Sequence, residues 1–215
     1  ITNLKLTNKV DMIGSYSFYN LSISTIQIPS SLTIIGDHAF ARCEITGSIV
    51  IPNNVDEIGF GVFEECSIES LELPFLGSDI DDDYDNNIGW IFGDRDHGTN
   101  NHPYLNSLTT VKIHNGEIGE YAFARTRISE LILVNQKHIG DYAFYQCDFI
   151  YTLDLSMIST IGRNAFNECR YLSKLYLSNE LTRIYENAFD VSRSFERNIY
   201  FDGSIEDWCK VSLSS

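Results

Sequence analysis

Ile139-Gly140-Asp141-Tyr142-Ala143-Phe144 is one of seven near-copies of a single phrase in this chain. The opening isoleucine recurs at intervals of 22, 23, 60, 21, 22 and 23 residues, and the last copy carries Tyr185 in place of the glycine. A period near 22 residues is too short for an independent domain, so each unit must bury its apolar side chains against its neighbours. The repeats therefore predict a solenoid. The opening isoleucines are Ile13, Ile35, Ile58, Ile118, Ile139, Ile161 and Ile184.

Each repeat also contains a short segment in which apolar residues alternate with mostly polar ones, as in Leu153-Asp154-Leu155. An alternation of period two predicts a strand with one buried face. Because every unit runs in the same direction, we expect the strands to pair in parallel in one sheet on the concave side. The nine segments begin at Leu4, Ile26, Ile49, Leu71, Val111, Leu131, Leu153, Leu175 and Ile199.

The glycine phrase supplies the other half of the unit. Glycine permits a tight bend or a close approach of two backbones. The Asp, Glu or Ser that follows it is a residue type that caps helices, so Tyr-Ala-Phe is expected to form a short helical or 3-10 turn on the convex side. The phenylalanine of each copy, such as Phe144, is expected to join a buried spine.

Composition and charge narrow the functional classes. Apolar residues make up 43% of the chain, which is enough for a continuous core. The formal net charge is −15, with the 15 Lys and Arg residues scattered, so the basic stripe of a nucleic-acid-binding protein is missing. The sequence has no apolar run of the length that a membrane span needs.

Four of the five cysteines share one position in the repeat. Cys43, Cys66, Cys147 and Cys169 each follow the repeat phenylalanine by three residues. A small, readily buried side chain suits an inward position, so we expect reduced cysteines in the core rather than disulfides. The spacing of zinc-binding cysteine pairs is absent, and Cys209 stands apart as a free thiol.

An insertion at about residues 75–107 interrupts the repeats. Its Trp90-Ile91-Phe92-Gly93 stretch is expected to be buried as a degenerate repeat. The acidic run Asp79–Asp85 has the alternation of a calcium loop but lacks its glycine and final glutamate, so we favour a solvated acidic loop, with adventitious cations and a calcium site as alternatives. His97 and His102 lie near acidic residues, and we interpret them as part of a polar loop.

The repeat resembles the BspA-like class of leucine-rich repeats, in which L-x-x-L-x-L-P is followed by I-G-x-x-A-F-x-x-C. The resemblance covers residues 1–201, and the tail from Ile199 to Trp208 is similar to the end piece of that family. It implies a secreted or surface-anchored protein with an adhesive or recognition role. The departures are Tyr185, Thr126 in place of a cysteine, and the insertion.

We therefore expect the α/β fold class: a single leucine-rich-repeat solenoid over residues 1–215, with a parallel β-sheet on the concave face and short helical or 3-10 turns on the convex side. The insertion at about 75–107 and a cap-like piece at about 199–215 belong to the same domain. The chain enters its first strand almost at once, so a preceding cap is expected to be missing.

The motif search indicates a protein that is not an enzyme, because no catalytic, cofactor-binding or metal-binding motif emerges. The first hypothesis is a noncatalytic adhesion module at the cell surface or outside the cell. It would be a monomer that binds a protein or carbohydrate ligand, without nucleic acid or a membrane span, through its concave face and insertion loop. The alternative is a repeat scaffold fused to a catalytic domain outside this chain.

The candidate contact surface consists of strand residues that point to solvent. Ile132 is apolar where its equivalents are mainly polar, and Tyr176 and Tyr200 are expected to lie side by side near the C-terminal end. Tyrosine is common in binding hot spots. An ordinary solvated sheet remains the alternative. The candidate residues are Gln27, Glu72, Lys112, Ile132, Asp154, Lys174, Tyr176 and Tyr200.

Overall fold

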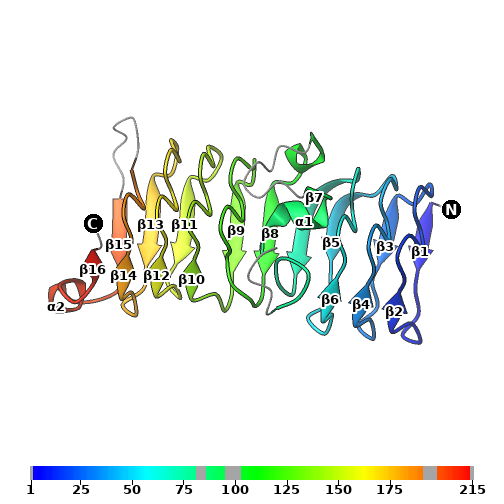
Figure 1. The fold of residues 1–215 in the computed structure, drawn as a ribbon, viewed down its shortest axis with the longest axis horizontal. Helices are drawn as coiled ribbons and strands as arrows, with labels where there is room; N and C mark the ends of the chain where they lie inside the picture. Colours follow the sequence, from blue (N-terminus) through cyan, green and yellow to red (C-terminus); the bar gives the residue numbers. More distant parts are fainter. Residues whose placement is uncertain (1, 81–85, 95–102, 191–197, 214–215) are drawn as a thin grey trace.

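The chain forms a parallel β-solenoid with very little helix, as the computed structural model of residues 2–80, 86–94, 103–190 and 198–213 shows. The turns of the solenoid, here called rungs, lie side by side along the long axis, with the two termini at opposite ends (Figure 1). Each rung has a main strand on one side and a chain of turns on the other, which we call the turn side. The solenoid expected from the repeats is thus confirmed.

All nine expected main strands are present in the described residues, and all pair in parallel. Their outward-pointing side chains form what we call the sheet face. The main strands are β1 (Asn3–Lys5), β3 (Thr25–Gln27), β5 (Thr46–Val50), β7 (Ser67–Leu73), β8 (Thr110–Ile113), β9 (Glu130–Leu133), β11 (Thr152–Leu155), β13 (Lys174–Leu177) and β15 (Asn198–Phe201).

The main strands do not form one continuous sheet, which corrects the expectation. They form three sheets, β1-β3, β5-β7-β8-β9 and β11-β13-β15, so that the described residues contain two seams, between β3 and β5 and between β9 and β11. Both seams lie where the segment leading into the strand lengthens. Leu131 follows Thr126 by five residues, whereas Leu153 follows Cys147 by six; Ile26 follows Leu21 by five, whereas Ile49 follows Cys43 by six.

In the C-terminal sheet, leading segments of equal length go with full pairing. Leu153 and Leu175 each follow their repeat cysteine by six residues, and β11 and β13 pair along their full length, from Thr152↔Lys174 to Leu155↔Leu177. An extra residue accompanies both seams, but a difference of one residue does not always interrupt the ladder: Ile49 follows Cys43 by six residues and Leu71 follows Cys66 by five, and β5 and β7 still pair, with a register shift between Gly47 and Ser48.

A second series of short strands ends at the isoleucine of the phrase in six of the seven copies, and β16 extends the series beyond the last copy. The series forms the sheets β2-β4-β6 and β10-β12-β14-β16, and Ile118 forms an isolated bridge with Ile139. These strands are β2 (Met12–Ile13), β4 (Ile34–Ile35), β6 (Glu57–Ile58), β10 (His138–Ile139), β12 (Thr160–Ile161), β14 (Arg183–Ile184) and β16 (Ser212–Leu213).

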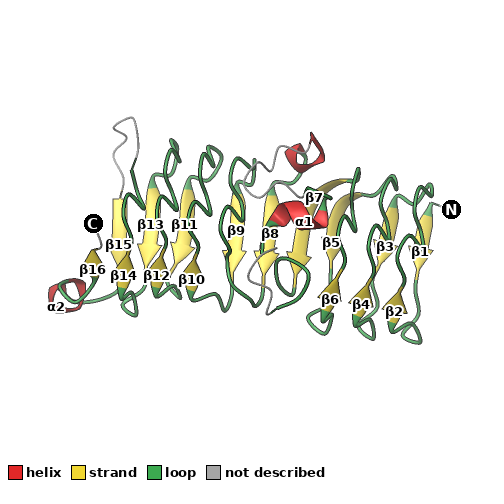
Figure 2. Cartoon of the chain, in the orientation of Figure 1, coloured by secondary structure: helices red, strands yellow, loops and turns green. Residues whose placement is uncertain are grey.

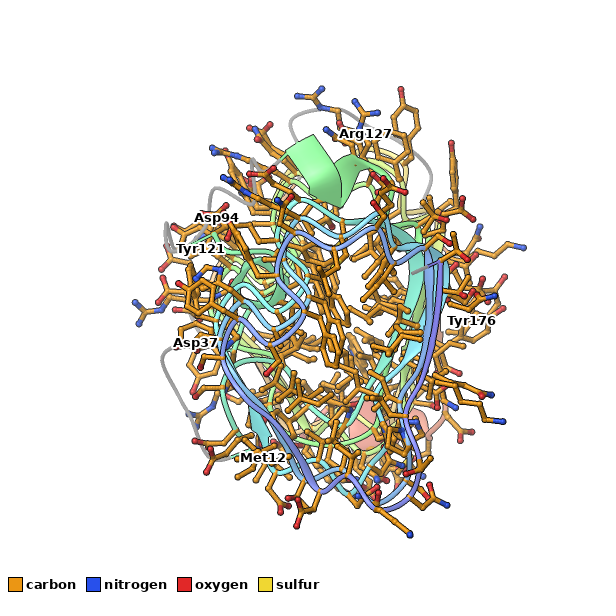
Figure 3. The ribbon with its side chains drawn as sticks, turned by 90° about the vertical axis from the view of Figure 1, so that its right-hand side faces the viewer. Met12, Asp37, Asp94, Tyr121, Arg127 and Tyr176 are labelled. Atoms are coloured by element: carbon orange, nitrogen blue, oxygen red, sulfur yellow. The ribbon has the colours of Figure 1, made fainter. Side chains whose placement is uncertain are left out.

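The core runs through the solenoid between the main strands and the turn side (Figure 3). The repeat phenylalanines stack in it rung upon rung: Phe123, Phe144 and Phe166 have ring centroids 5.4 and 5.0 Å apart and are fully buried. Phe18, Phe40 and Phe63 form a similar stack nearer the N-terminus. The expected phenylalanine spine is confirmed.

The helical segments expected on the convex side are not confirmed. The turn side of the repeats consists of successive turns, and in six of the seven copies two described residues of the turn chain have positive φ, as Tyr142 (54°) and Gln146 (57°) do. A positive φ cannot continue a right-handed helix but fits the third position of a type II turn. The helices α1, η1 and α2 lie outside the glycine phrases (Figure 2).

After the glycine of each phrase, the backbone hydrogen bonds from one turn chain to the next run in one direction, whereas the glycine N–H itself donates backwards, as Gly140 does to Ile118. The N–H groups of Tyr142, Phe144 and Gln146 donate to the carbonyls of Arg163, Ala165 and Asn167 in the next rung. Wherever two described turn chains are joined by such bonds, the N–H groups of the earlier rung donate and the carbonyls of the later rung accept. The acidic residue after the glycine adds to these bonds instead of capping a helix: Asp141 accepts the N–H of Arg163 at 2.7 Å.

The Trp90-Ile91-Phe92 stretch of the insertion packs as a substitute rung, as expected, with Ile91 and Phe92 fully buried and Trp90 half-buried. It contains α1 (Ile88–Ile91), and the N–H of Phe63 donates to Ile91 while Ile88 donates to Ala122. η1 (Pro103–Asn106) follows. β7 and β8 pair directly, so the added residues leave the ladder of main strands intact.

The C-terminal piece continues the stack. α2 (Ile205–Trp208) begins with a capping box between Ser204 and Asp207, and β16 then pairs with β14. Trp208 packs edge-on against Phe201, with ring centroids 5.2 Å apart. None of the helices in the described ranges has the length and apolar character that crossing a membrane requires.

The four repeat cysteines are buried and reduced, and each thiol donates to the carbonyl of a phenylalanine in the preceding rung. Cys147, for example, lies 2.8 Å from the carbonyl oxygen of Phe123. Burial raises the pKa of Cys66 and of Cys147 to about 12. These thiols therefore stay protonated at neutral pH.

We expect iodoacetamide at pH 8 to modify only Cys209 in the folded protein, because only this cysteine is exposed and alkylation requires the thiolate. Intact-mass measurement should show one added group in the native protein and five after unfolding in guanidinium chloride. Cys209→Ser is the control and should take up none in the native state. Rapid modification of two or more thiols would contradict the buried arrangement.

Candidate ligand-binding face

The main strands place all eight predicted contact residues on the sheet face. Tyr176 projects from one side of the solenoid and Asp37 and Tyr121 from the opposite side (Figure 3). Strand register aligns Glu72, Lys112 and Ile132 in one row and Asp154, Tyr176 and Tyr200 in another. Gln27 lies on β3, beyond the first seam, and Lys174 lies beside Thr152 and Asn198.

The middle of the sheet face holds a cluster of charges that pair with one another. One carboxylate oxygen of Glu72 lies 3.0 Å from Lys112 Nζ and 2.6 Å from His114 Nε2. Hydrogen bonds from His114 and then Lys112 hold the pKa of Glu72 below its ordinary value. Because these charges satisfy one another, this part of the face offers a ligand little uncompensated charge.

We expect the contribution of Glu72 to stability to disappear at low pH. A carboxyl group whose pKa is lower in the folded state stabilises the fold fully above its unfolded pKa, about 4.3, and loses that effect as pH falls through the folded value. Glu72→Gln should lower the free energy of unfolding by up to about 1 kcal/mol at pH 6. The effect is small because the Glu72–Lys112 pair is partly exposed.

Urea unfolding at a series of pH values would measure this effect. The difference between the wild type and Glu72→Gln should shrink below about pH 4.3, as the carboxyl group becomes protonated. Glu57→Gln, which alters an exposed carboxylate on β6, is the matched control. If the difference in free energy of unfolding between the wild type and Glu72→Gln stayed constant from pH 6 to pH 2.5, the proposed charge interaction would be contradicted.

The C-terminal part of the sheet face has a different character. Tyr176 and Tyr200 stack with ring centroids 4.9 Å apart and an interplanar angle of 15°. They are 39% and 47% exposed, and Ile132 is 43% exposed. The predicted adjacency of the tyrosines is confirmed, whereas contact of any of the eight residues with a ligand stays a prediction.

Two hollows lie on this part of the face. One, of about 180 Å³, lies at the seam between β9 and β11 and is lined by Leu131, Ile132, Leu133, Asp154, Met157 and Ile158 among others. The other, of about 330 Å³, is lined by Asp154, Ser156, Tyr176, Tyr200, Phe201 and Asp202 among others. Asp154 and Ser156 line both, so the hollows adjoin.

Sequence reasoning missed Ser156, Met157 and Asp202 because they follow the strands, where alternation no longer tells which side chains return to the sheet face. It also missed the pairing of Glu72 with His114. The signal for that pair was available, because His114 lies two residues after Lys112 and so points to the same side of the sheet.

The calcium alternative and the histidine pair in the insertion fall largely outside the described residues, which include only Asp79 of the acidic run. Among the residues that the structure does describe, no three His, Cys, Asp or Glu side chains form a group that could hold a metal ion.

Comparison with known proteins gives one family and several similar structures. The model of the BspA type leucine-rich repeat region matches residues 1–86 and 100–211, in 6 copies. A leucine-rich repeat protein from Bacteroides ovatus ATCC 8483 has a TM-score of 0.60 and 21% identity over 94% of this chain. The chain spans only 54% of that protein, and the likeness shows the fold alone.

A second solved structure, a leucine rich cell surface protein from Faecalibacterium prausnitzii A2-165, has a TM-score of 0.45 and 17% identity. That alignment covers 99% of this chain and 62% of the other. A search of curated proteins finds no match.

Proposed function

This chain belongs to the BspA-type leucine-rich repeat family, and from that premise we propose that it is a noncatalytic recognition module of a cell-surface or secreted protein. As a monomer, it binds a macromolecular ligand, a protein or a carbohydrate, through the sheet face and the neighbouring insertion. The family supplies the repeat scaffold; the adhesive role and the surface location rest on the resemblance of the repeats.

The observation that carries the proposal is the exposed patch of Ile132, Tyr176 and Tyr200. Large apolar and aromatic side chains on a rigid sheet lose little conformational entropy on binding, which is why such residues dominate binding hot spots. The net charge of −15 is unfavourable for a nucleic-acid ligand, because binding to phosphates depends on Lys and Arg.

The test is to probe protein and glycan arrays with the labelled chain. Tyr176→Ala/Tyr200→Ala should weaken binding to the captured ligand by at least about tenfold if the pair is a hot spot. Tyr151→Ala/Tyr171→Ala is the matched control, since this second pair is 57% and 46% exposed and its ring centroids are 6.0 Å apart. Equal binding by the wild type and both double variants would refute the tyrosine pair as a hot spot, and the proposal would lose the observation that carries it.

A further inference from the structure

The seam between β9 and β11 is an opening in the sheet face. In the described residues no ladder joins the two strands, which belong to different sheets. Leu131 and Leu133, on the β9 side, are half-buried, whereas Val111 and Ile113 at the same positions of β8 are fully buried. At the seam, these two apolar side chains are therefore less covered than their equivalents in β8, and the facing edges of β9 and β11 have no ladder between them.

Backbone groups at such a seam are suited to a peptide main chain. Where the sheet is intact, Ile51 N–H donates to the Glu72 carbonyl of the next rung at 2.9 Å. Leu133 and Asp154 hold the equivalent positions at the seam, but β9 and β11 are not paired there. An extended peptide can bond to strand edges through its backbone and place alternate side chains in neighbouring pockets.

The charged groups around the two adjoining hollows have one sign. Asp154 and Asp202 contribute carboxylates, and neither set of described lining residues includes Lys or Arg. One oxygen of Asp154 accepts the N–H of Ser156 at 2.9 Å. This contrasts with the middle of the sheet face, where Lys112 and His114 flank the carboxylate of Glu72.

The carboxylates beside the tyrosine pair favour a cationic ligand over a neutral sugar. Each ring already has one face stacked against the other tyrosine. The outer faces of the stack remain for a ligand. A Lys or Arg side chain can contact an outer face through a cation–π interaction while its charge approaches a carboxylate. Ile132 and Met157, which are 43% and 44% exposed, then contact a neighbouring apolar side chain.

We propose that the β9/β11 seam and the adjoining Tyr176–Tyr200 pair bind an extended, cationic peptide segment of a protein ligand. This proposal rests on the proposed function and narrows it. The cationic side chain lies between the tyrosines and the carboxylates of Asp154 and Asp202. An apolar side chain of the ligand occupies the hollow at Ile132 and Met157.

Fluorescence anisotropy with three labelled probes tests the proposal on the whole chain. The probes are a peptide that alternates lysine with leucine and threonine, the same peptide with glutamate for lysine, and cellohexaose as a neutral glycan. We expect only the lysine peptide to bind. Tyr176→Ala should weaken its affinity about tenfold, and Asp154→Asn about threefold.

Glu57→Gln controls for the charge change, because it removes one negative charge elsewhere and should leave the affinity unchanged. Equal weakening by Glu57→Gln and Asp154→Asn would indicate a general attraction to the acidic chain and would overturn the proposal. A lack of binding of the lysine peptide at 1 mM, about the weakest affinity worth assigning, would also overturn it.

The outcomes also separate this proposal from the proposed function. Binding of cellohexaose that is lost in Tyr176→Ala, without peptide binding, would overturn the cationic ligand but support recognition by the sheet face. Suppose that the Tyr176→Ala/Tyr200→Ala variant no longer binds an array ligand and that this ligand does not compete with the lysine peptide. That result would also overturn the cationic ligand but support recognition by the sheet face. If the double variant has no effect on any array ligand, the proposed function itself fails.

Discussion

Phe144→Ala is expected to lower the free energy of unfolding by about 3–5 kcal/mol. Phe144 is fully buried and lies between Phe123 and Phe166, so truncation removes stacking on both sides and leaves a cavity in the middle of the column. A rung has no core apart from the one that it shares with its neighbours, so the surroundings cannot refill the space with residues from elsewhere.

Urea unfolding, monitored by circular dichroism in the far ultraviolet, would measure this loss of free energy of unfolding. Phe149→Ala is the matched control, because it makes the same chemical change at a side chain that is 44% exposed, and it should cost less than about 1 kcal/mol. If Phe144→Ala costs no more than Phe149→Ala, the phenylalanine column is not the main source of rung stability.

Gly140→Ala is expected to cost about 3 kcal/mol, near the upper end of what an overpacked core usually costs. The backbone of the preceding rung approaches Gly140 so closely that an added Cβ would lie 2.5 Å from the carbonyl carbon of Gly119 and 2.8 Å from the backbone nitrogen of Glu120. Backbone atoms cannot rotate away as a side chain can, so the two rungs must separate.

Gly14 provides an internal control for this prediction, because it occupies the same position in the first copy of the phrase. An added Cβ there meets only the hydroxyl oxygen of Ser17, at 3.3 Å, which can rotate away. Gly14→Ala should therefore change stability by less than about 1 kcal/mol. Thermal unfolding of the two variants side by side would test whether rung spacing sets the requirement for glycine, and equal losses would refute it.

The natural exception at this position is Tyr185. In the rung that carries it, Ile184 is 8% exposed, whereas Ile161 in the preceding rung is fully buried. The rung that lacks the glycine is thus the one whose core isoleucine is packed less completely.

Much of the fold could be predicted because one repeat determines the others. Alternation in Leu153-Asp154-Leu155 identified a strand, and the spacing of Phe144 and Phe166 identified a buried column. The turn side could not be predicted the same way. Tyr-Ala-Phe has no strong signal against a helix, and Tyr142 adopts a positive φ because hydrogen bonds to the next rung fix its backbone.

The candidate site was predicted in part. Register followed from the repeat, so the adjacency of Tyr176 and Tyr200 could be read from the sequence. The seam between β9 and β11 could not be predicted from the sequence. It coincides with one extra residue between Cys147 and Leu153, but the repeat period varies between 21 and 23 residues, and this variation does not show where a sheet is interrupted. The hollows follow from the seam and were missed with it.

The one-directional hydrogen bonds of the turn side give the solenoid an electrical polarity. Because the peptide units bonded between the turns after the glycine point the same way, their dipoles add along the long axis, with the N–H ends toward the C-terminal rungs and the carbonyl ends toward the N-terminal rungs. A rung therefore fits its neighbours in only one orientation. Copies of the 22-residue unit can lengthen the rod by tandem duplication, whereas an inverted copy would place donor against donor.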